Sequence, residues 1–246
     1  MLLTLLYHRI NNEKFGIDPK SLENHLKYFK KHFNIIFPGE KIIPYKINLC
    51  LTFDDAYFDF FKFAYPLLLK YKIKATLAIP VKYILDETDI NDDIRLNTSY
   101  KEAHEDIIYK KKAPFCTYKE LLIMKKSNFL NFASHSYSHQ NLLNSNIDLK
   151  KEIIESKQTL IDKLGSDIST FVYPLGKFNE NINNLVKSHY KYAFRIGSAL
   201  NFSWQNFSNI TYRVLCDNIK NEKKIFSLKN FISYFWFYYL NTFRGR

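Results

Sequence analysis

An apolar run that ends in two adjacent carboxylates constrains the fold of this chain more than any other stretch. Residues 46–55 read Lys-Ile-Asn-Leu-Cys-Leu-Thr-Phe-Asp-Asp, and a short apolar run of this kind is typical of a strand buried in a parallel sheet. Functional groups in α/β folds follow the carboxyl ends of such strands. Adjacent carboxylates repel each other unless a cation or a donor lies between them. Asp54 and Asp55 therefore predict a polar site, with a metal ion as the first candidate.

Further apolar runs alternate with amphipathic stretches along the chain. Strands are expected near 2–8, 74–80, 129–133, 170–173, 192–196 and 210–215, and helices near 21–33, 57–71, 117–126, 147–164 and 180–189. Ser21 is the expected N-cap of the first helix, Pro66 predicts a kink or a late start in the second, and Gly165 is the expected end of the fourth. Strands alternating with helices indicate an α/β fold with a mostly parallel sheet, open or closed into a barrel.

The length of the chain favours one domain. With 246 residues and 46% hydrophobic content, the chain can bury one sizeable core. Residues 1–225 are expected to form this domain, and residues 226–246 a separate C-terminal helix. Residues 86–112 are rich in Asp, Glu, Asn and Lys, which predicts an insertion over one mouth of the fold, mobile or partly helical.

The charge balance suggests an anionic partner. The net charge of +12 and the pI of about 9.4 favour nucleic acid, an acidic membrane surface or an anionic substrate. The alternative is that the Lys excess reflects biased composition and forms only a solvated surface. A role in nucleic-acid binding would rest on charge and aromatic content alone, and no nucleic-acid partner is expected. The sequence does not indicate an oligomeric state.

The cysteines and the N-terminus favour a cytoplasmic protein. Cys50, Cys116 and Cys216 are an odd, widely spaced set, which suggests neither a disulfide framework nor a thiolate zinc site. The run Met1–Arg9 has no basic stretch before it and is too short for a signal peptide or a membrane span. It is therefore interpreted as the first core strand, which ends at His8.

A second group of polar residues follows the strand expected near 129–133. His135 and His139 are four residues apart in the stretch His-Ser-Tyr-Ser-His. Each His alone would more often be a surface residue. Together with one Asp, the pair forms a set suited to zinc or another divalent ion, with positions left open for water and substrate.

These motifs resemble those of the polysaccharide deacetylases, the NodB-homology group of carbohydrate esterases. Residues 52–56 (Thr-Phe-Asp-Asp-Ala) look like the Thr-Phe-Asp-Asp-Gly motif of that family, and residues 135–139 match its His-Ser/Thr-x-x-His motif. Residues 173–176 (Tyr-Pro-Leu-Gly) are similar to the loop that supplies the oxyanion donor. The resemblance runs from Leu5 to about Arg213.

The resemblance implies a distorted (β/α) barrel of about seven parallel strands and a metal-dependent removal of an N-acyl group, typically acetyl, from an amino sugar of a glycan or glycolipid precursor. It implies one divalent metal ion, zinc first, with Co, Ni, Fe or Mn as alternatives. By position, Asp55, His135 and His139 would hold the metal, and Asp54 would be the general base. The oxyanion donor would be the backbone N–H of Leu175, because it occupies the Tyr position of the family loop. The neighbouring residues Tyr173, Pro174 and Gly176 would contact substrate.

The chain departs from the family pattern in three places. The family's late Leu-x-x-His motif is missing, but residues 5–8 (Leu-Leu-Tyr-His) resemble a permuted branch that carries the His on its first strand, which makes His8 the expected general acid. Val172 replaces the Arg that orients the base, and Arg213 is the candidate substitute. Ala56 replaces the Gly after the Asp pair, where a Cβ restricts the turn. This replacement leaves open a catalytically weak or inactive saccharide-binding relative.

The last stretch of the chain is aromatic on nearly all sides. Residues 228–246 hold eight aromatic side chains between basic ends: Phe231, Tyr234, Phe235, Trp236, Phe237, Tyr238, Tyr239 and Phe243, with Lys223, Lys224, Lys229, Arg244 and Arg246 around them. A helix of this composition is too short to cross a bilayer and fits the surface of an anionic membrane. The alternative is a terminal helix packed on the barrel or on a dimer partner. An interfacial helix would place the protein on the inner face of the membrane, with a lipid-linked saccharide as substrate.

Overall fold

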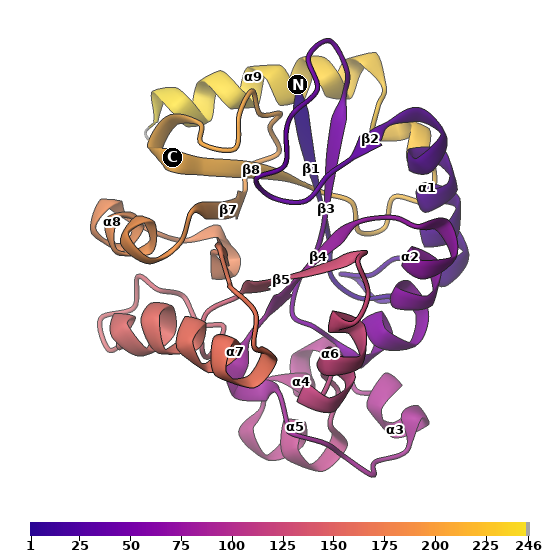
Figure 1. The fold of residues 1–246 in the computed structure, drawn as a ribbon, viewed down its shortest axis with the longest axis vertical. Helices are drawn as coiled ribbons and strands as arrows, with labels where there is room; N and C mark the ends of the chain where they lie inside the picture. Colours follow the sequence, from indigo (N-terminus) through magenta and orange to yellow (C-terminus); the bar gives the residue numbers. More distant parts are fainter. Residues whose placement is uncertain (245–246) are drawn as a thin grey trace.

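The structure, a computed structural model, is a closed barrel of parallel strands surrounded by helices (Figure 1). It describes residues 1–244; Gly245 and Arg246, the end of the predicted C-terminal segment, lie outside the described residues. The sheet has eight strands in the order β1-β8-β7-β6-β5-β4-β3-β2, and the additional pairing of β1 with β3 closes seven of them and leaves β2 outside the ring. The predicted distorted (β/α) barrel is confirmed.

The seven barrel strands are apolar runs that are almost entirely buried. They are β1 (Leu2–Tyr7), β3 (Asn48–Phe53), β4 (Ala75–Ile79), β5 (Leu130–Ser134), β6 (Thr170–Val172), β7 (Tyr192–Ile196) and β8 (Ile210–Leu215). Burial on both faces explains why most of these strands lack alternating polar residues; β8, with Thr211 and Arg213, is an exception. All pairings between them are parallel, so their carboxyl ends meet at one mouth of the barrel.

The short strand β2 (Asn34–Ile35), which sequence reasoning missed, accounts for part of the distortion. It pairs with Asn48 and Leu49 at the start of β3, whereas β4 pairs only with Thr52 and Phe53 at the end of β3. Two different strands therefore share one side of β3. The side chain of Asn48 fills the corner between β2, β3 and the N-terminus through a hydrogen bond to the Met1 carbonyl and one from Asn34.

The helices around the barrel follow the predicted order. They are α1 (Pro19–His32), α2 (Tyr65–Tyr71), α6 (Tyr118–Lys125), α7 (Ser156–Leu164) and α8 (Glu180–His189). Two π-helices, η1 (Phe60–Ala64) and η3 (Lys150–Glu155), precede α2 and α7, and short 3-10 turns span η2 (Val81–Tyr83), η4 (Pro174–Gly176), η5 (Phe207–Asn209) and η6 (Glu222–Lys224). The change from π to α geometry occurs just before Pro66. Gly165 ends α7 with φ 58°, as predicted.

The N-cap of α1 differs from the prediction. Asp18 rather than Ser21 occupies this position, and its carboxylate accepts hydrogen bonds from the backbone N–H and the hydroxyl of Ser21. Pro19 is therefore the first helical residue, where its missing N–H costs nothing. Ser21 contributes to the cap as a donor.

The predicted insertion folds into three short helices, α3 (Asp92–Leu96), α4 (Tyr100–Ala103) and α5 (Asp106–Lys112). The buried side chain of Arg9, next to the end of β1, holds this segment: its guanidinium donates to the carbonyl oxygens of Leu96 and Thr98 and to the carboxylate of Asp59. A second buried arginine, Arg95, pairs with Glu120 on α6. These contacts fix the insertion against the barrel.

The last helix, α9 (Leu228–Phe243), lies along the outside of the barrel. In Figure 1 it crosses the end of the molecule near the N-terminus, opposite the insertion helices. Tyr234 is its buried residue, and the ring of Tyr238 meets Tyr212 of β8 edge-on at 6.3 Å. Among the described residues, the helices are all too short or too polar to cross a membrane.

Candidate active site

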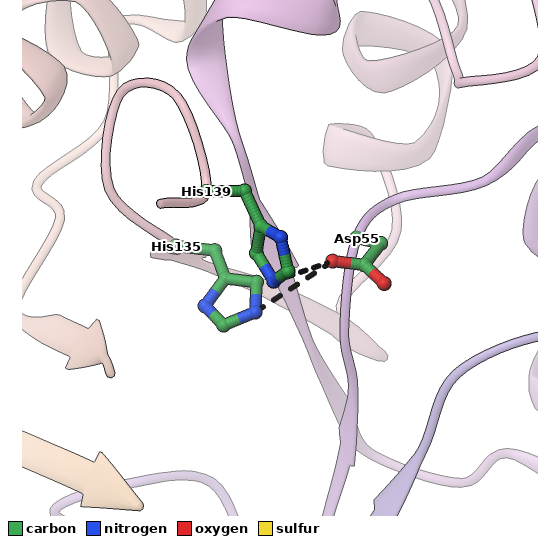
Figure 2. Close-up of side chains that lie close together, drawn as sticks. All are labelled: Asp55, His135 and His139. Atoms are coloured by element: carbon green, nitrogen blue, oxygen red, sulfur yellow. Dashed lines mark ion pairs between the residues drawn. The ribbon is translucent and has the colours of Figure 1, made fainter. Parts of the chain in front are cut away.

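Asp55, His135 and His139 form a compact cluster at the mouth of the barrel (Figure 2). Asp55 follows β3, and His135 follows β5, so their strands deliver both side chains to the same end. Nε2 of His139 lies 3.3 Å and Nε2 of His135 lies 3.6 Å from Oδ1 of Asp55. One ligand atom from each residue falls within 4.8 Å of the others. This is the predicted set of two imidazoles and one carboxylate.

The chemistry of these groups fits a divalent cation. Both carboxylate oxygens of Asp55 are buried without a hydrogen-bond partner, a costly state for a charged group. Burial lowers the pKa of His135 to about 4 and the pKa of His139 to about 3, so both rings are neutral and present lone pairs to the carboxylate. A cation between them would satisfy all three residues. Nδ1–H of His135 donates to the Val172 carbonyl at 2.8 Å, which leaves Nε2 free as the ligand atom.

The loop that carries the two histidines is held by its own serines and by Glu152. The hydroxyl oxygen of Ser136 accepts the backbone N–H of His139 at 3.0 Å, and both residues have positive φ angles, 65° and 55°. The buried carboxylate of Glu152 accepts the backbone N–H groups of Tyr137 and Ser138. The hydroxyl groups of Ser136 and Ser138 therefore stabilise a tight, strained turn between the two histidines.

Asp54 lies beside this cluster and is paired with Arg213. Nη1 and Nη2 of Arg213 contact the two carboxylate oxygens of Asp54 at 2.6 and 2.8 Å, and both side chains are buried. Burial alone would raise the pKa of Asp54, but the charge of Arg213 outweighs it and holds this pKa well below its usual range. Asp54 is therefore ionised, and its Oδ2 lies 3.6 Å from Nε2 of His135.

His8 follows β1 and forms a pair with Asp217, which follows β8. Nδ1–H of His8 donates to Oδ2 of Asp217 at 2.6 Å, and the backbone N–H of His8 donates to Oδ1 at 3.1 Å. Burial acts to lower the pKa of His8, but the hydrogen bond and charge of Asp217 raise it to about 9. The ring is therefore protonated at neutral pH. Sequence reasoning missed Asp217, although it shows a signal similar to that of Asp54, a carboxylate within two residues of the end of a mostly buried strand.

The predicted oxyanion loop follows β6. Leu175 lies on the 3-10 turn η4 with φ 55°, and its side chain is 55% exposed. The ring of Tyr173 is buried, and its hydroxyl donates to Asn183 on α8. Pro174 is buried as well. An open cavity of about 630 Å³ adjoins the loop at Leu175 and Gly176 and extends to Lys187 and Arg195.

Ala56 adopts a left-handed backbone conformation, which glycine adopts more readily. Asp55 and Ala56 have φ angles of 69° and 52°, both in the left-handed region that favours glycine. An alanine in this region costs roughly 1–2 kcal/mol. Ala56 is fully buried in the core, and its carbonyl accepts the backbone N–H of Cys116 at 2.7 Å. The turn therefore persists without glycine, and Asp55 still reaches the two histidines.

The insertion contributes residues to the site that the sequence did not reveal. The ring of His104 stacks on the ring of His139, with centroids 5.2 Å apart at 26°. Tyr100 lies against Phe15 and His104. From the sequence, His104 and Tyr100 could be placed in the segment expected over one mouth of the fold. Their contacts with individual residues of the site could not be predicted.

The fold and the site together define a (β/α)-barrel protein with a candidate metal site at the mouth of the barrel. Residues 44–193 match the polysaccharide deacetylase family, and the chain belongs to that family. The matched range contains Asp54, Asp55, His135 and His139, but it excludes His8 and Arg213. The assignment of these two residues, and of a permuted branch with an N-terminal Tyr-His motif, therefore remains a prediction that rests on the geometry of the barrel.

Several relatives share most of the chain. A poly-beta-1,6-N-acetyl-D-glucosamine N-deacetylase of Staphylococcus aureus is 22% identical over 79% of this chain and 71% of its own length. The structure of a deacetylase of Streptococcus pyogenes in complex with acetate superposes with a TM-score of 0.73 at 20% identity, covering 92% of this chain and 96% of that one. A de-N-acetylase from Aggregatibacter actinomycetemcomitans gives a TM-score of 0.71 at 17% identity, covering 94% of this chain and 99% of that one. The structural likenesses support the fold.

Proposed function

We propose that this protein is a metal-dependent N-deacetylase that removes acetyl groups from an amino sugar of a glycan or glycolipid precursor. One observation carries the proposal: a metal-binding set, an ionised carboxylate and a protonated imidazole meet at one mouth of the barrel. All three groups would assist hydrolysis of an amide, since water must lose a proton, the leaving amine must gain one and the carbonyl must be polarised. The name of the Staphylococcus aureus relative supports an N-acetylated glucosamine polymer as substrate.

Asp55, His135 and His139 would hold the metal ion, with zinc as the first candidate because two imidazoles and one carboxylate suit it. When bound, such an ion supplies a Lewis acid that polarises the amide carbonyl and makes water a better nucleophile. The hydrogen bond from His135 to the Val172 carbonyl orients this ligand.

Asp54 and His8 would carry the two proton transfers. Asp54 accepts a proton from the attacking water as the new C–O bond forms, and Arg213 orients its carboxylate. His8 then gives its proton to the sugar nitrogen as the C–N bond breaks, which releases acetate and a free amine. Asp217 keeps His8 protonated and fixes its ring.

The backbone N–H of Leu175 would donate to the oxyanion of the tetrahedral intermediate. The donor belongs to the backbone, so a leucine at this position can supply it as well as a tyrosine. Tyr173 is buried against α8, and its part in substrate binding would be to support the loop, whereas Pro174 and Gly176 would shape its path beside the sugar.

The test is acetate release from an N-acetylated β-1,6-glucosamine oligomer by the zinc-loaded protein. We expect mass spectrometry to show the loss of one acetyl group per modified sugar, and chelation followed by zinc addition to abolish and restore the reaction. A protein that binds zinc and the oligomer but releases no acetate from any N-acetylated sugar would instead be the saccharide-binding relative that Ala56 suggests.

The pH dependence of the reaction tests the pair of His8 and Asp217. An acid must be protonated to act, so activity should fall as pH rises through the pKa of His8, which is about 9. Asp217→Asn removes the charge that raises this pKa and leaves only a weaker, neutral acceptor for Nδ1–H of His8. The alkaline limb of kcat/KM should therefore move to lower pH by about one to two units.

Metal content measured on the same samples is the control, and it should not change in Asp217→Asn. His8→Ala should lower the rate and remove the alkaline limb that this residue produces. If the limb stays in place in both variants, another group is the acid.

A further inference from the structure

We infer that the outer face of α9 is a docking surface for an anionic membrane. Seven apolar side chains on this helix are exposed, and six of them recur at helical spacing and form one continuous stripe along its length; the seventh, Phe237, lies outside the stripe. The stripe consists of Leu228, Ile232, Phe235, Trp236, Tyr239 and Phe243. Scattered exposed apolar residues are ordinary, but a contiguous stripe indicates a partner.

The opposite face of α9 fixes the stripe in its outward orientation. Tyr234 is buried and its carbonyl accepts the backbone N–H of Leu200, while the amide of Asn241 donates to the Gly197 carbonyl at 2.9 Å. The ring of Tyr238 packs edge-on against Phe202 at 4.9 Å. These contacts span the helix and attach it to the connection between β7 and β8. Turning the stripe inward would break all of them.

The connection between β7 and β8 enlarges the apolar surface. Phe202 is itself exposed and meets Phe235 edge-on with ring centroids 6.4 Å apart. A segment outside the helix therefore contributes to the same surface. We call Phe202 and the six residues of the stripe the α9 patch.

The charges around the α9 patch favour an anionic lipid surface as its binding partner. The helix contains no Asp or Glu, and exposed cations flank both of its ends: Lys223, Lys224 and Lys229 at the start and Arg244 after the last turn. Trp236 and Tyr239, in the middle of the stripe, are 62% and 51% exposed. Amphipathic aromatic rings favour the depth of lipid headgroups, and cations nearby attract anionic lipid.

The same charges disfavour a second copy of the chain on this surface. A two-fold interface would bring the cations beside both patches together, and each chain carries a net charge of +12. A lipid bilayer offers the opposite charge. Docking through α9 also leaves the mouth of the barrel uncovered, because the insertion helices and α9 lie at opposite ends of the molecule (Figure 1).

Vesicle binding by the full chain tests this inference. Vesicles of phosphatidylglycerol and phosphatidylcholine in equal parts should sediment the protein, and pure phosphatidylcholine vesicles should do so more weakly. In a Trp204→Phe background, the remaining Trp236 should show blue-shifted fluorescence on the anionic vesicles, because its ring leaves water. Trp204 is buried and binds the Glu40 carbonyl, so melting temperature must confirm that this background folds.

Separate variants test the apolar residues of the α9 patch and the cations beside it. Trp236→Ser should weaken partitioning about tenfold or more, and Lys223→Glu with Lys224→Glu should weaken it in a salt-dependent manner. Ile107→Ser is the apolar control and Lys111→Glu is the charge control, because both exposed side chains lie on α5, at the opposite end of the molecule from α9 (Figure 1). Neither control should alter partitioning, and Trp236→Ser should keep its activity on a soluble oligomer.

Two results would overturn the inference. One is equal partitioning of Trp236→Ser and the unaltered protein. The other is a dimer in analytical ultracentrifugation that Trp236→Ser dissociates, together with no binding to anionic vesicles, which would assign the patch to a second copy. Both results leave the deacetylase proposal intact, since α9 holds none of its residues.

Discussion

Asp54→Asn should lower kcat by about 10²–10⁴, the range that general-base catalysis supplies, while the protein still binds zinc. The reason is that the two adjacent carboxylates have different neighbours. Asp55 lies next to both His135 and His139 and bonds to no other group, whereas both oxygens of Asp54 bond to Arg213 and only its Oδ2 also approaches His135, at 3.6 Å. Asparagine keeps the shape of the side chain but cannot accept a proton from water. Activity on an N-acetylated oligomer and zinc content of the same sample measure the two effects separately.

The control must account for the arginine that loses its partner. Removing one member of a buried ion pair costs roughly 3–5 kcal/mol of stability, and Asp54→Asn leaves Arg213 uncompensated. Asp59→Asn is the matched variant: Asp59 is a buried carboxylate 2.8 Å from Nε of Arg9 and is none of the proposed catalytic or metal-binding residues, and Arg9 keeps its bonds to the Leu96 and Thr98 carbonyls that hold the insertion. It should lower the melting temperature without a comparable loss of kcat. Equal zinc loss in Asp54→Asn and Asp55→Asn would refute the separation of base and ligand.

The pairing of Asp54 with Arg213 illustrates what a sequence can and cannot predict. The motifs allowed Asp54, Asp55, His135 and His139 to be predicted at one mouth of the barrel. Each of these residues follows an apolar run, and the carboxyl ends of parallel strands lie at the same mouth. Arg213 lies 159 residues from Asp54, and no spacing rule joins them. Closure of the barrel joins them, because β8 pairs with β1 and β1 pairs with β3. The arginine could be suggested only once a barrel was assumed.

Other parts of the site depend on tertiary contacts that leave no local pattern. His104 reaches His139 because Arg9 and Arg95 fix the insertion, and each of these arginines bonds to backbone carbonyl groups as well as to a carboxylate. Carbonyl acceptors carry no sequence signature. The strained turn at Ala56 could not be predicted either. The sequence shows that alanine replaces the glycine of the family motif, but it does not show whether the backbone keeps the left-handed conformation. Packing of Ala56 in the core maintains the left-handed geometry.

His135→Ala should abolish zinc binding at concentrations that saturate the unaltered protein, and activity should fall with it. The cluster offers three ligand atoms, and at metal sites even the loss of a residue that only hydrogen-bonds to a ligand costs about 10–100-fold in affinity, so the loss of a proposed ligand should cost more. Because a metal ion supplies several kcal/mol of transition-state stabilisation, kcat/KM should drop by about 10³ or more. Zinc titration by calorimetry and metal analysis after dialysis measure the binding directly.

His25→Ala separates loss of a ligand from loss of a buried imidazole. His25 is fully buried, bonds to the Tyr7 hydroxyl at 2.9 Å, and burial lowers its pKa to about 4, so its environment resembles that of His135 except for the cluster. Both variants should lower stability by leaving a cavity, but only His135→Ala should lose zinc. His139→Ala should behave like His135→Ala, because both Nε2 atoms face the same oxygen of Asp55. If His135→Ala binds zinc as tightly as His25→Ala does, the unpaired oxygens of Asp55 are not the centre of a metal site, and the proposed hydrolysis must proceed without the ion.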